Sequence, residues 1–164
     1  MEIKIRPATI NDLEDIKKLN AMLFQNEYDN FDQTLDLKWP FGQEADDYFK
    51  KRIAGDGCAL IACIDDKTVG YLAGGFHQFG PFPGMAESSY RTLPNFSELE
   101  NMCVVEEHRG KGIGTKLCQE FLTWSKAKGA VRMSVLASAN NPETVNFYRK
   151  NGFIDYDLIL EKDI

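Results

Sequence analysis

Residues 104–115 have the sequence Val104-Val105-Glu106-Glu107-His108-Arg109-Gly110-Lys111-Gly112-Ile113-Gly114-Thr115. The segment leaves a predicted strand, passes through a glycine-rich turn and enters a predicted helix. Three glycines within five residues indicate positive φ angles, and the missing Cβ atoms leave room for a bulky anion. Amides at a helix start point at such an anion, with the helix dipole behind them. Arg109 and Lys111 add positive charge there, which favours a pyrophosphate over a single carboxylate.

Other phosphate-binding motifs fit this spacing less well. A P-loop requires Gly-x-x-x-x-Gly-Lys-Ser/Thr and a dinucleotide fingerprint requires Gly-x-Gly-x-x-Gly, whereas the glycines here follow Gly-x-Gly-x-Gly. A dinucleotide-binding domain would also have an acid after the next strand, where this chain has Ser138-Ala139-Asn140. The remaining alternative is a glycine-rich surface turn without a ligand.

The chain on both sides of this turn alternates between strand and helix patterns. Alternating or continuous apolar residues predict strands at residues 2–6, 58–64, 68–76, 97–105, 131–138 and 153–160. Apolar residues three and four apart predict helices at residues 10–24, from about residue 44, at 112–128 and between Asn141 and Gly152. Alternation within residues 97–105 predicts that Glu98, Glu100, Met102 and Val104 share one face.

The composition indicates one domain over residues 1–164, with 43% hydrophobic and 27% charged residues. No apolar run approaches the roughly 18 to 20 residues of a membrane span, and the N-terminus does not resemble a signal peptide. We therefore expect a cytoplasmic protein with no membrane partner. The net charge of −6 argues against nucleic acid and slightly favours a cationic substrate, although solubility alone would explain it. Four cysteines without a Cys-x-x-Cys pair and two histidines predict no metal site.

Two segments are candidates for recognition of a substrate. Residues 77–94 form the longest predicted loop, and loops of this length tend to be functional. Residues 25–47 combine aromatic side chains with acids, of which Asp29, Asp32 and Asp36 are candidates to attract a cation. An ordinary polar loop is the alternative for these acids.

Two motifs resemble the GCN5-related N-acetyltransferase (GNAT) superfamily. Arg109-Gly110-Lys111-Gly112-Ile113-Gly114 is similar to its acetyl-CoA loop, Arg/Gln-x-x-Gly-x-Gly/Ala. Residues 141–153, from Asn141-Pro142 through Phe147-Tyr148 to Gly152-Phe153, are similar to its Asn-x-x-Ala-x-x-Phe-Tyr-x-x-x-Gly-Phe. Thr144 replaces the usual alanine, and Glu106 stands where the family often has proline. The specific resemblance covers residues 98–153, about a third of the chain.

The resemblance implies an α/β (α+β) fold with a mixed, mostly antiparallel twisted sheet. It implies six to seven strands, about four helices, and a splayed V-shaped cleft for the cofactor. That cofactor would be acetyl-CoA as co-substrate, with no metal. The residues implied in its binding are Met102, Cys103, Val104, Val105, Arg109, Gly110, Lys111, Gly112, Ile113, Gly114, Thr115, Asn141 and Tyr148.

The implied activity is an acyltransferase reaction that moves an acetyl group from acetyl-CoA to a primary amine of a small molecule or peptide. Tyr148 is the candidate acid for the leaving thiolate, because a phenol with a pKa near ~10 is protonated at pH 7. Glu100 is the first candidate for the base that deprotonates the amine, and Glu98 or a water chain are alternatives. A non-catalytic acyl-CoA-binding sensor is the alternative function. The acceptor, the acyl-chain preference and the oligomeric state, a homodimer included, stay open.

Overall fold

The structure is a computed structural model of the chain that describes residues 2–76, 95–156, 158–160 and 162. The predicted loop at 77–94, with His77, lies outside the described residues. The strands are β1 (Lys4–Pro7), β2 (Cys58–Ile64), β3 (Lys67–Phe76), β4 (Phe96–Val104) and β5 (Arg132–Val135). The helices are α1 (Leu13–Asn30), α2 (Gln43–Ala54), α3 (Ile113–Ala127) and α4 (Pro142–Lys150), with short 3-10 turns at Ile10–Asp12, Trp39–Phe41 and Glu106–His108.

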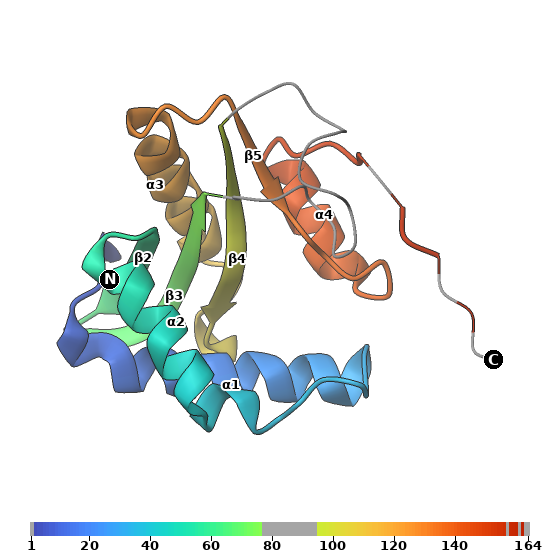
Figure 1. Cartoon of the computed structure of the whole chain (residues 1–164), viewed down its shortest axis with the longest axis horizontal. Helices are drawn as coiled ribbons and strands as arrows, with labels where there is room; N and C mark the ends of the chain where they lie inside the picture. Colours follow the sequence, from blue (N-terminus) through green and yellow to red (C-terminus); the bar gives the residue numbers. More distant parts are fainter. Residues whose placement is uncertain (1, 77–94, 157, 161, 163–164) are drawn as a thin grey trace.

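The five strands form one sheet in the order β1-β2-β3-β4-β5 (Figure 1). The first four pair antiparallel, and β4 and β5 pair parallel. The hairpin between β2 and β3 turns through Asp65 and Asp66, whose φ angles of 48° and 61° suit residues that tolerate the left-handed region. The mixed, mostly antiparallel sheet with four helices is therefore confirmed.

The number of strands is lower than predicted, because residues 153–156 and 158–160 belong to no strand. Gly152, with φ of 89°, ends α4, and the chain then extends away from β5 (Figure 1). Ile154, Leu158 and Leu160 are exposed at 84%, 71% and 84%. Alternating apolar residues predict a strand only where a neighbouring edge is within reach, and here the segment lies apart from the sheet. The prediction of a strand is therefore wrong for residues 153–156 and 158–160, and the described part of the chain has five strands where six to seven were predicted.

Helix α1 continues to Asn30, whereas the sequence predicted an end near Phe24. Two side-chain hydrogen bonds span the extra turns: Gln25 Nε2 donates to Asp29 Oδ1 at 2.9 Å, and Asn30 Nδ2 donates to the carbonyl of Asn26 at 2.9 Å. Such i to i+4 pairs stabilise a helix whose outer face is polar. The added turns bring the end of α1 to the edge of β4.

The helices cover the two faces of the sheet and form two apolar cores. Ile16 of α1 and Phe49 of α2 pack with Tyr71 on one face. Leu117 and Phe121 of α3 pack with Leu72 on the other. These residues are fully buried, and a fully buried phenylalanine or leucine contributes about 2 to 3 kcal/mol to folding. No helix in the described part of the chain is long and apolar enough to cross a membrane.

Strands β4 and β5 pair over only four residues and then separate. The parallel register runs from Phe96↔Arg132 to Leu99↔Val135. Beyond Leu99, β4 continues to Val104 and pairs there with β3 alone. The edge of β4 that faces β5 thus opens into a gap, which confirms the predicted splayed V-shaped arrangement.

Candidate functional site

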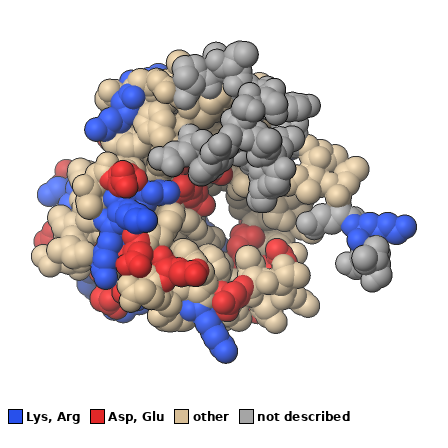
Figure 2. All heavy atoms as spheres, viewed as in Figure 1, with Lys and Arg blue, Asp and Glu red and all other residues tan. Residues whose placement is uncertain are grey.

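A cleft with a volume of about 760 Å³ opens where β4 and β5 separate. Its walls come from the end of α1, from β4, from the turn before α3, from the end of β5 and from α4. The space-filling view shows this face hollowed near its centre, with acidic side chains at the border (Figure 2). The cleft therefore joins the two segments that carried the sequence motifs.

Two of the three glycines in the turn have the positive φ angles that the sequence predicts, whereas Gly114, in the first turn of α3, does not. Gly110 and Gly112 have φ angles of 73° and 80°, and a Cβ at either would meet no atom within 4 Å. The amide of Lys116 donates to the carbonyl of Gly112 at 3.0 Å as the first bond of α3. Within the described ranges, the amides of residues 110–115 donate no hydrogen bond. A row of open amides at the N-terminus of a 15-residue helix suits an anion.

Two cations lie on this turn and hold its backbone. Arg109 Nε donates to the carbonyl of Val104 at 3.0 Å and so ties the turn to the end of β4. Lys111 Nζ donates to the carbonyl of Glu107 at 2.8 Å and lies 3.3 Å from Nδ1 of His108. Both side chains add positive charge to this turn, and Arg109 also lines the cleft, which favours an anion there.

Gly114 has a packing role that the sequence did not reveal. A Cβ at this position would come within 3.1 Å of the Phe147 ring, closer than most Cβ contacts. The glycine therefore lets α4 pack directly on the first turn of α3. This contact brings Asn141 and Tyr148, both on or beside α4, to the wall of the cleft.

Tyr148 is 8% exposed and lines the cleft. Its ring packs edge-on against Phe147 and Phe153, with centroid distances of 5.1 and 5.4 Å. Burial raises the pKa of Tyr148 well above its ordinary value, with smaller contributions from Cys118 and Glu27. The phenol is thus a protonated hydrogen-bond donor at neutral pH, and full loss of its proton is unfavourable.

Asn141 is the N-cap of α4, as the sequence predicted. Its Oδ1 accepts a hydrogen bond from the amide of Thr144 at 3.1 Å. Its Nδ2 donates to Oε1 of Glu27 on α1 at 3.2 Å, which joins the two helices across one end of the cleft. Asn141 lines the cleft, and its contact with pantetheine stays a prediction.

A β-bulge in β4 overturns the prediction that four residues share a face. Ala73 pairs with Asn101 and Gly74 with Leu99, so Glu100 has no direct partner on β3. The extra residue reverses the alternation at this point. Met102 and Val104 pack on the α3 side of the sheet, whereas Glu100 contacts α2 on the opposite side.

Both oxygens of the Glu100 carboxylate are engaged by α2. Arg52 donates to Oε1 at 2.7 Å through Nη2 and to Oε2 at 2.9 Å through Nε, and the hydroxyl of Tyr48 also donates to Oε2. The bidentate pair is partly buried, with side-chain exposures of 18% and 21%. Such contacts stabilise the ionised carboxylate and occupy the lone pairs that a base would use. The role of Glu100 as a base stays a prediction, and the geometry does not favour it.

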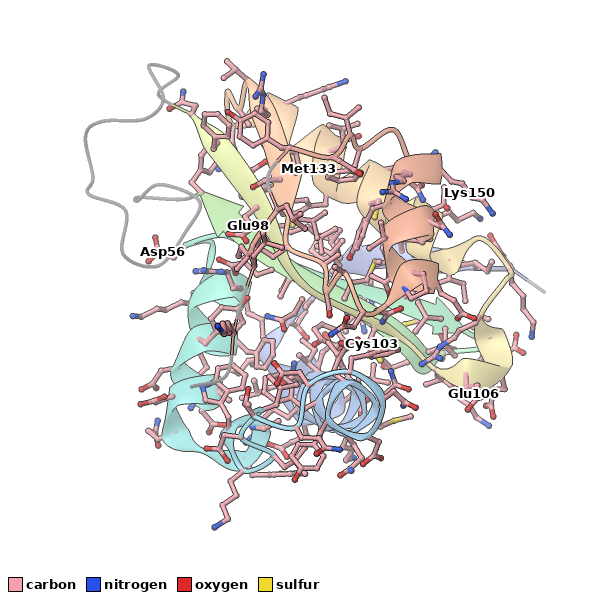
Figure 3. All side chains as sticks on the ribbon, turned by 90° about the vertical axis from the view of Figure 1, so that its right-hand side faces the viewer. Asp56, Glu98, Cys103, Glu106, Met133 and Lys150 are labelled. Atoms are coloured by element: carbon pink, nitrogen blue, oxygen red, sulfur yellow. The ribbon has the colours of Figure 1, made fainter. Side chains whose placement is uncertain are left out.

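Glu98 has a different environment on the same strand. It is 7% exposed and pairs across the sheet with Gly75, where an added Cβ would meet the Arg52 side chain. Burial raises the pKa of Glu98 to about 7, the Glu100 charge adds to the rise, and Arg52 opposes it. Glu98 and Cys103 lie toward opposite ends of β4 (Figure 3). Of the two glutamates, Glu98 has the pKa that suits a base at neutral pH.

The acids expected to attract a cation divide between the cleft and the surface. Asp32 lines the cleft. Asp29 accepts from Gln25 on an exposed part of α1, and Asp36 accepts from the amide of Lys38 in a turn at 2.9 Å. Nowhere in the described residues do three or more His, Cys, Asp or Glu side chains form a group that could hold a metal ion.

Sequence reasoning missed three residues of the cleft and its surroundings. Glu27 was assigned to a loop, although it continues the inward stripe of Ile16, Asn20 and Leu23 at helical spacing. That spacing is the signal that could have identified it. Tyr48 and Arg52 gave no signal, because their contact with Glu100 is set by the packing of α2 on β4.

Comparison with known proteins gives one family match. The sequence profile of the acetyltransferase (GNAT) family matches residues 21–153. An uncharacterized N-acetyltransferase of Bacillus subtilis is 39% identical over 61 residues, 37% of this chain and 25% of that protein. An uncharacterized N-acetyltransferase of Methanocaldococcus jannaschii is 24% identical over 94% of this chain, which spans 62% of that protein. An N-alpha-acetyltransferase of Sulfurisphaera tokodaii is 24% identical over 96% of this chain and 84% of its own length.

Solved structures share the fold at low sequence identity. A Bacillus halodurans protein, solved as a tetramutant, superimposes with a TM-score of 0.80 and 18% identity over 98% of this chain and 99% of its own. The aminoglycoside N-acetyltransferase AAC(6')-Iy in complex with CoA superimposes with a TM-score of 0.73 and 16% identity. The superposition covers 99% of this chain and 95% of that enzyme's chain. The same enzyme has been solved with a bisubstrate analog of CoA and an aminoglycoside, with a TM-score of 0.70.

Proposed function

The chain belongs to the acetyltransferase (GNAT) family, and from this premise we propose that it is an acetyl-CoA-dependent N-acetyltransferase. Its acceptor would be a primary amine of a small molecule or peptide, which attacks directly in a ternary complex. The observation that carries the proposal is the row of open amides at residues 110–115, at the mouth of a cleft between separated parallel strands. A similar fold in complex with CoA supports it.

The chain has hydrogen-bonding groups suited to the pyrophosphate and to the pantetheine arm of a CoA molecule. The amides of residues 110–115, with Arg109 and Lys111, would hold the pyrophosphate. The β4 edge beyond Leu99 lacks a strand partner in the described structure, so its backbone groups would pair with the pantetheine arm. The pyrophosphate would then lie at the α3 turn and the thioester inside the cleft, whose lining includes Glu100 at the β4 bulge and Tyr148.

The amine must lose a proton before it attacks. An amine with a pKa near ~10.4 costs about 4.6 kcal/mol to deprotonate at pH 7, from roughly 3.4 units at ~1.36 kcal/mol each. Of the two glutamates, Glu100 lines the cleft and Glu98 lies outside its lining. We propose that Glu98 accepts this proton through intervening water, because its pKa near 7 lets it accept a proton and release it again. Arg52 pairs with both oxygens of the neighbouring Glu100, so the two glutamates have different surroundings.

The transfer forms a C–N bond and breaks the C–S bond. A backbone N–H near the β4 bulge would donate to the carbonyl oxygen as negative charge develops there. Tyr148 would donate a hydrogen bond to the departing sulfur, which lowers the charge on the thiolate without full proton transfer.

The experiment that tests the proposal is a thiol-release screen across classes of amine, followed by mass spectrometry of the acetylated product. The proposal expects release of CoA thiol and a mass increase of one acetyl group for at least one class. Saturable CoA binding without release for any amine would support a non-catalytic sensor instead.

A further inference from the structure

The two ends of the cleft have opposite chemical character. At the α3 turn the lining residue Arg109 and the open amides present positive charge. On the opposite wall, formed by α1 and the residues after it, Glu27 and Asp32 present negative charge next to Phe24 and Phe31. If the anionic cofactor occupies the first end, the second is left for a group that is cationic and partly apolar.

Glu27 is a half-buried carboxylate without a cation. Its Oε1 accepts a hydrogen bond from Asn141 at 3.2 Å, and no ion pair among the described residues includes it. The helix end fixes its position, because its carbonyl accepts from the amides of Phe31 and Asp32 at 2.8 and 2.9 Å. Burial of an ionised carboxylate is costly unless it is paired. The pairing partner that the described residues do not provide can come from a ligand.

Glu27 also lies close to the groups that would react. Its hydrogen bond to Asn141 places it beside α4, which carries Tyr148. The charge of Glu27 is among the causes that raise the pKa of Tyr148, so the two side chains lie within electrostatic range. A cation held by Glu27 would therefore lie in the same cleft as Tyr148, the sulfur-side donor of the proposed transfer, and within electrostatic range of it.

We propose that Glu27 binds the ammonium group of the acceptor amine, while Phe24 and Phe31 pack against an apolar stem attached to it. This inference rests on the proposed function and names the substrate class: a primary ammonium ion on an apolar stem, with no carboxylate beside the nitrogen. A free α-amino acid is disfavoured, because its carboxylate would approach both Glu27 and Asp32.

The test is calorimetric titration of the CoA-bound protein with matched pairs of small ligands. The pairs are 2-phenylethylamine with 2-phenylethanol, and 3-methylbutylamine with 3-methylbutanol, and phenylalanine serves as the zwitterion. We expect at least one amine to bind tenfold or more tightly than its alcohol, and phenylalanine to bind more weakly than 2-phenylethylamine. In Glu27→Gln this preference should fall below about threefold. The new amide oxygen can still accept from Asn141, so the fold should be retained.

Asp29→Asn is the matched control, since it removes the same charge two residues away on an exposed part of α1. It should keep the full preference, and Glu27→Asp, which keeps the charge, should keep part of it. An unchanged preference in Glu27→Gln, or no tenfold preference in the wild type, would overturn the inference. CoA affinity, measured first, separates the two proposals: loss of CoA binding contradicts the proposed function, whereas normal CoA binding with no role for Glu27 contradicts only this one.

Discussion

Tyr148 combines burial with a place on the cleft wall, and its hydroxyl is the part that matters for the reaction. We predict that Tyr148→Phe lowers kcat by roughly 10²-fold, because the sulfur loses its hydrogen-bond donor. Acetyl-CoA affinity should change little, since the ring still packs against Phe147 and Phe153. Steady-state kinetics with acetyl-CoA titration measure both. Tyr28→Phe, on α1, is the control, and unchanged turnover in Tyr148→Phe would remove this residue from the mechanism.

Glu98 should give the reaction its pH dependence. Its folded pKa is raised to about 7, so the carboxylate is ionised and able to act as a base above that value. We predict that kcat/KM decreases as the pH is lowered through about 7, because Glu98 gains a proton and can no longer act as a base. The midpoint of this transition should lie near pH 7. Glu100 and Arg52 face the same region and shift this midpoint in opposite directions.

The measurement is a pH profile for the wild type, Glu98→Gln and Glu120→Gln, the last being an exposed control on α3. In Glu98→Gln the change of kcat/KM near pH 7 should disappear. The change at higher pH that comes from deprotonation of the amine itself should remain. A change near pH 7 that survives in Glu98→Gln would assign the base to another group.

At the scale of the elements, the α3 turn depends on glycine at Gly112. Its φ of 80° and the empty space around it allow an anion to reach the amides. We predict that Gly112→Glu weakens CoA binding by 10²-fold or more, because the new carboxylate lies against the pyrophosphate. Gly152→Glu is the matched control, since Gly152 has φ of 89° with nothing within 4 Å of an added Cβ. Wild-type CoA affinity in Gly112→Glu, or an equal loss of affinity in Gly152→Glu, would contradict an anion site at this turn.

The junction between β1 and α1 depends on one acid. Asp12 accepts from Arg6 at 2.6 and 2.8 Å and from the amide and hydroxyl of Thr9 at 2.7 and 2.8 Å. We predict that Asp12→Ala lowers the free energy of unfolding by about 3 kcal/mol, from a lost cap and an unpaired arginine. Asp29→Ala, on the surface of α1, should cost less than about 0.5 kcal/mol. Urea denaturation at pH 7 measures both.

The same acid predicts a change of stability with pH. The hydrogen bond from Arg6 is the main cause that holds the pKa of Asp12 far below its ordinary value, with Thr9 assisting. Its stabilisation is therefore complete above about pH 5, where the unfolded carboxyl is almost fully ionised, and declines as pH falls further. Asp12→Ala should lose this part of the acid dependence. An acid profile identical to that of the wild type would contradict the assignment.

Across the whole molecule, the sequence predicted what depends on local pattern and missed what depends on packing. The positive φ angles of Gly110 and Gly112 and the N-cap at Asn141 follow from residue types at fixed spacing. The exposed course of residues 153–160 and the β4 bulge at Glu100 depend on which strand lies alongside, which alternation does not encode. The bidentate ion pair between Arg52 and Glu100 joins residues that are 48 positions apart in the sequence, so no short-range pattern indicates it.

The fold and the cleft together make one central claim, that the open amides of residues 110–115 bind the pyrophosphate of acetyl-CoA. Titration of isotope-labelled protein with acetyl-CoA, followed amide by amide by NMR, tests it most directly. The account predicts that the amide signals of residues 110–115 shift most, together with those of the β4 edge beyond Leu99. Binding that leaves the signals of residues 110–115 in place would contradict it.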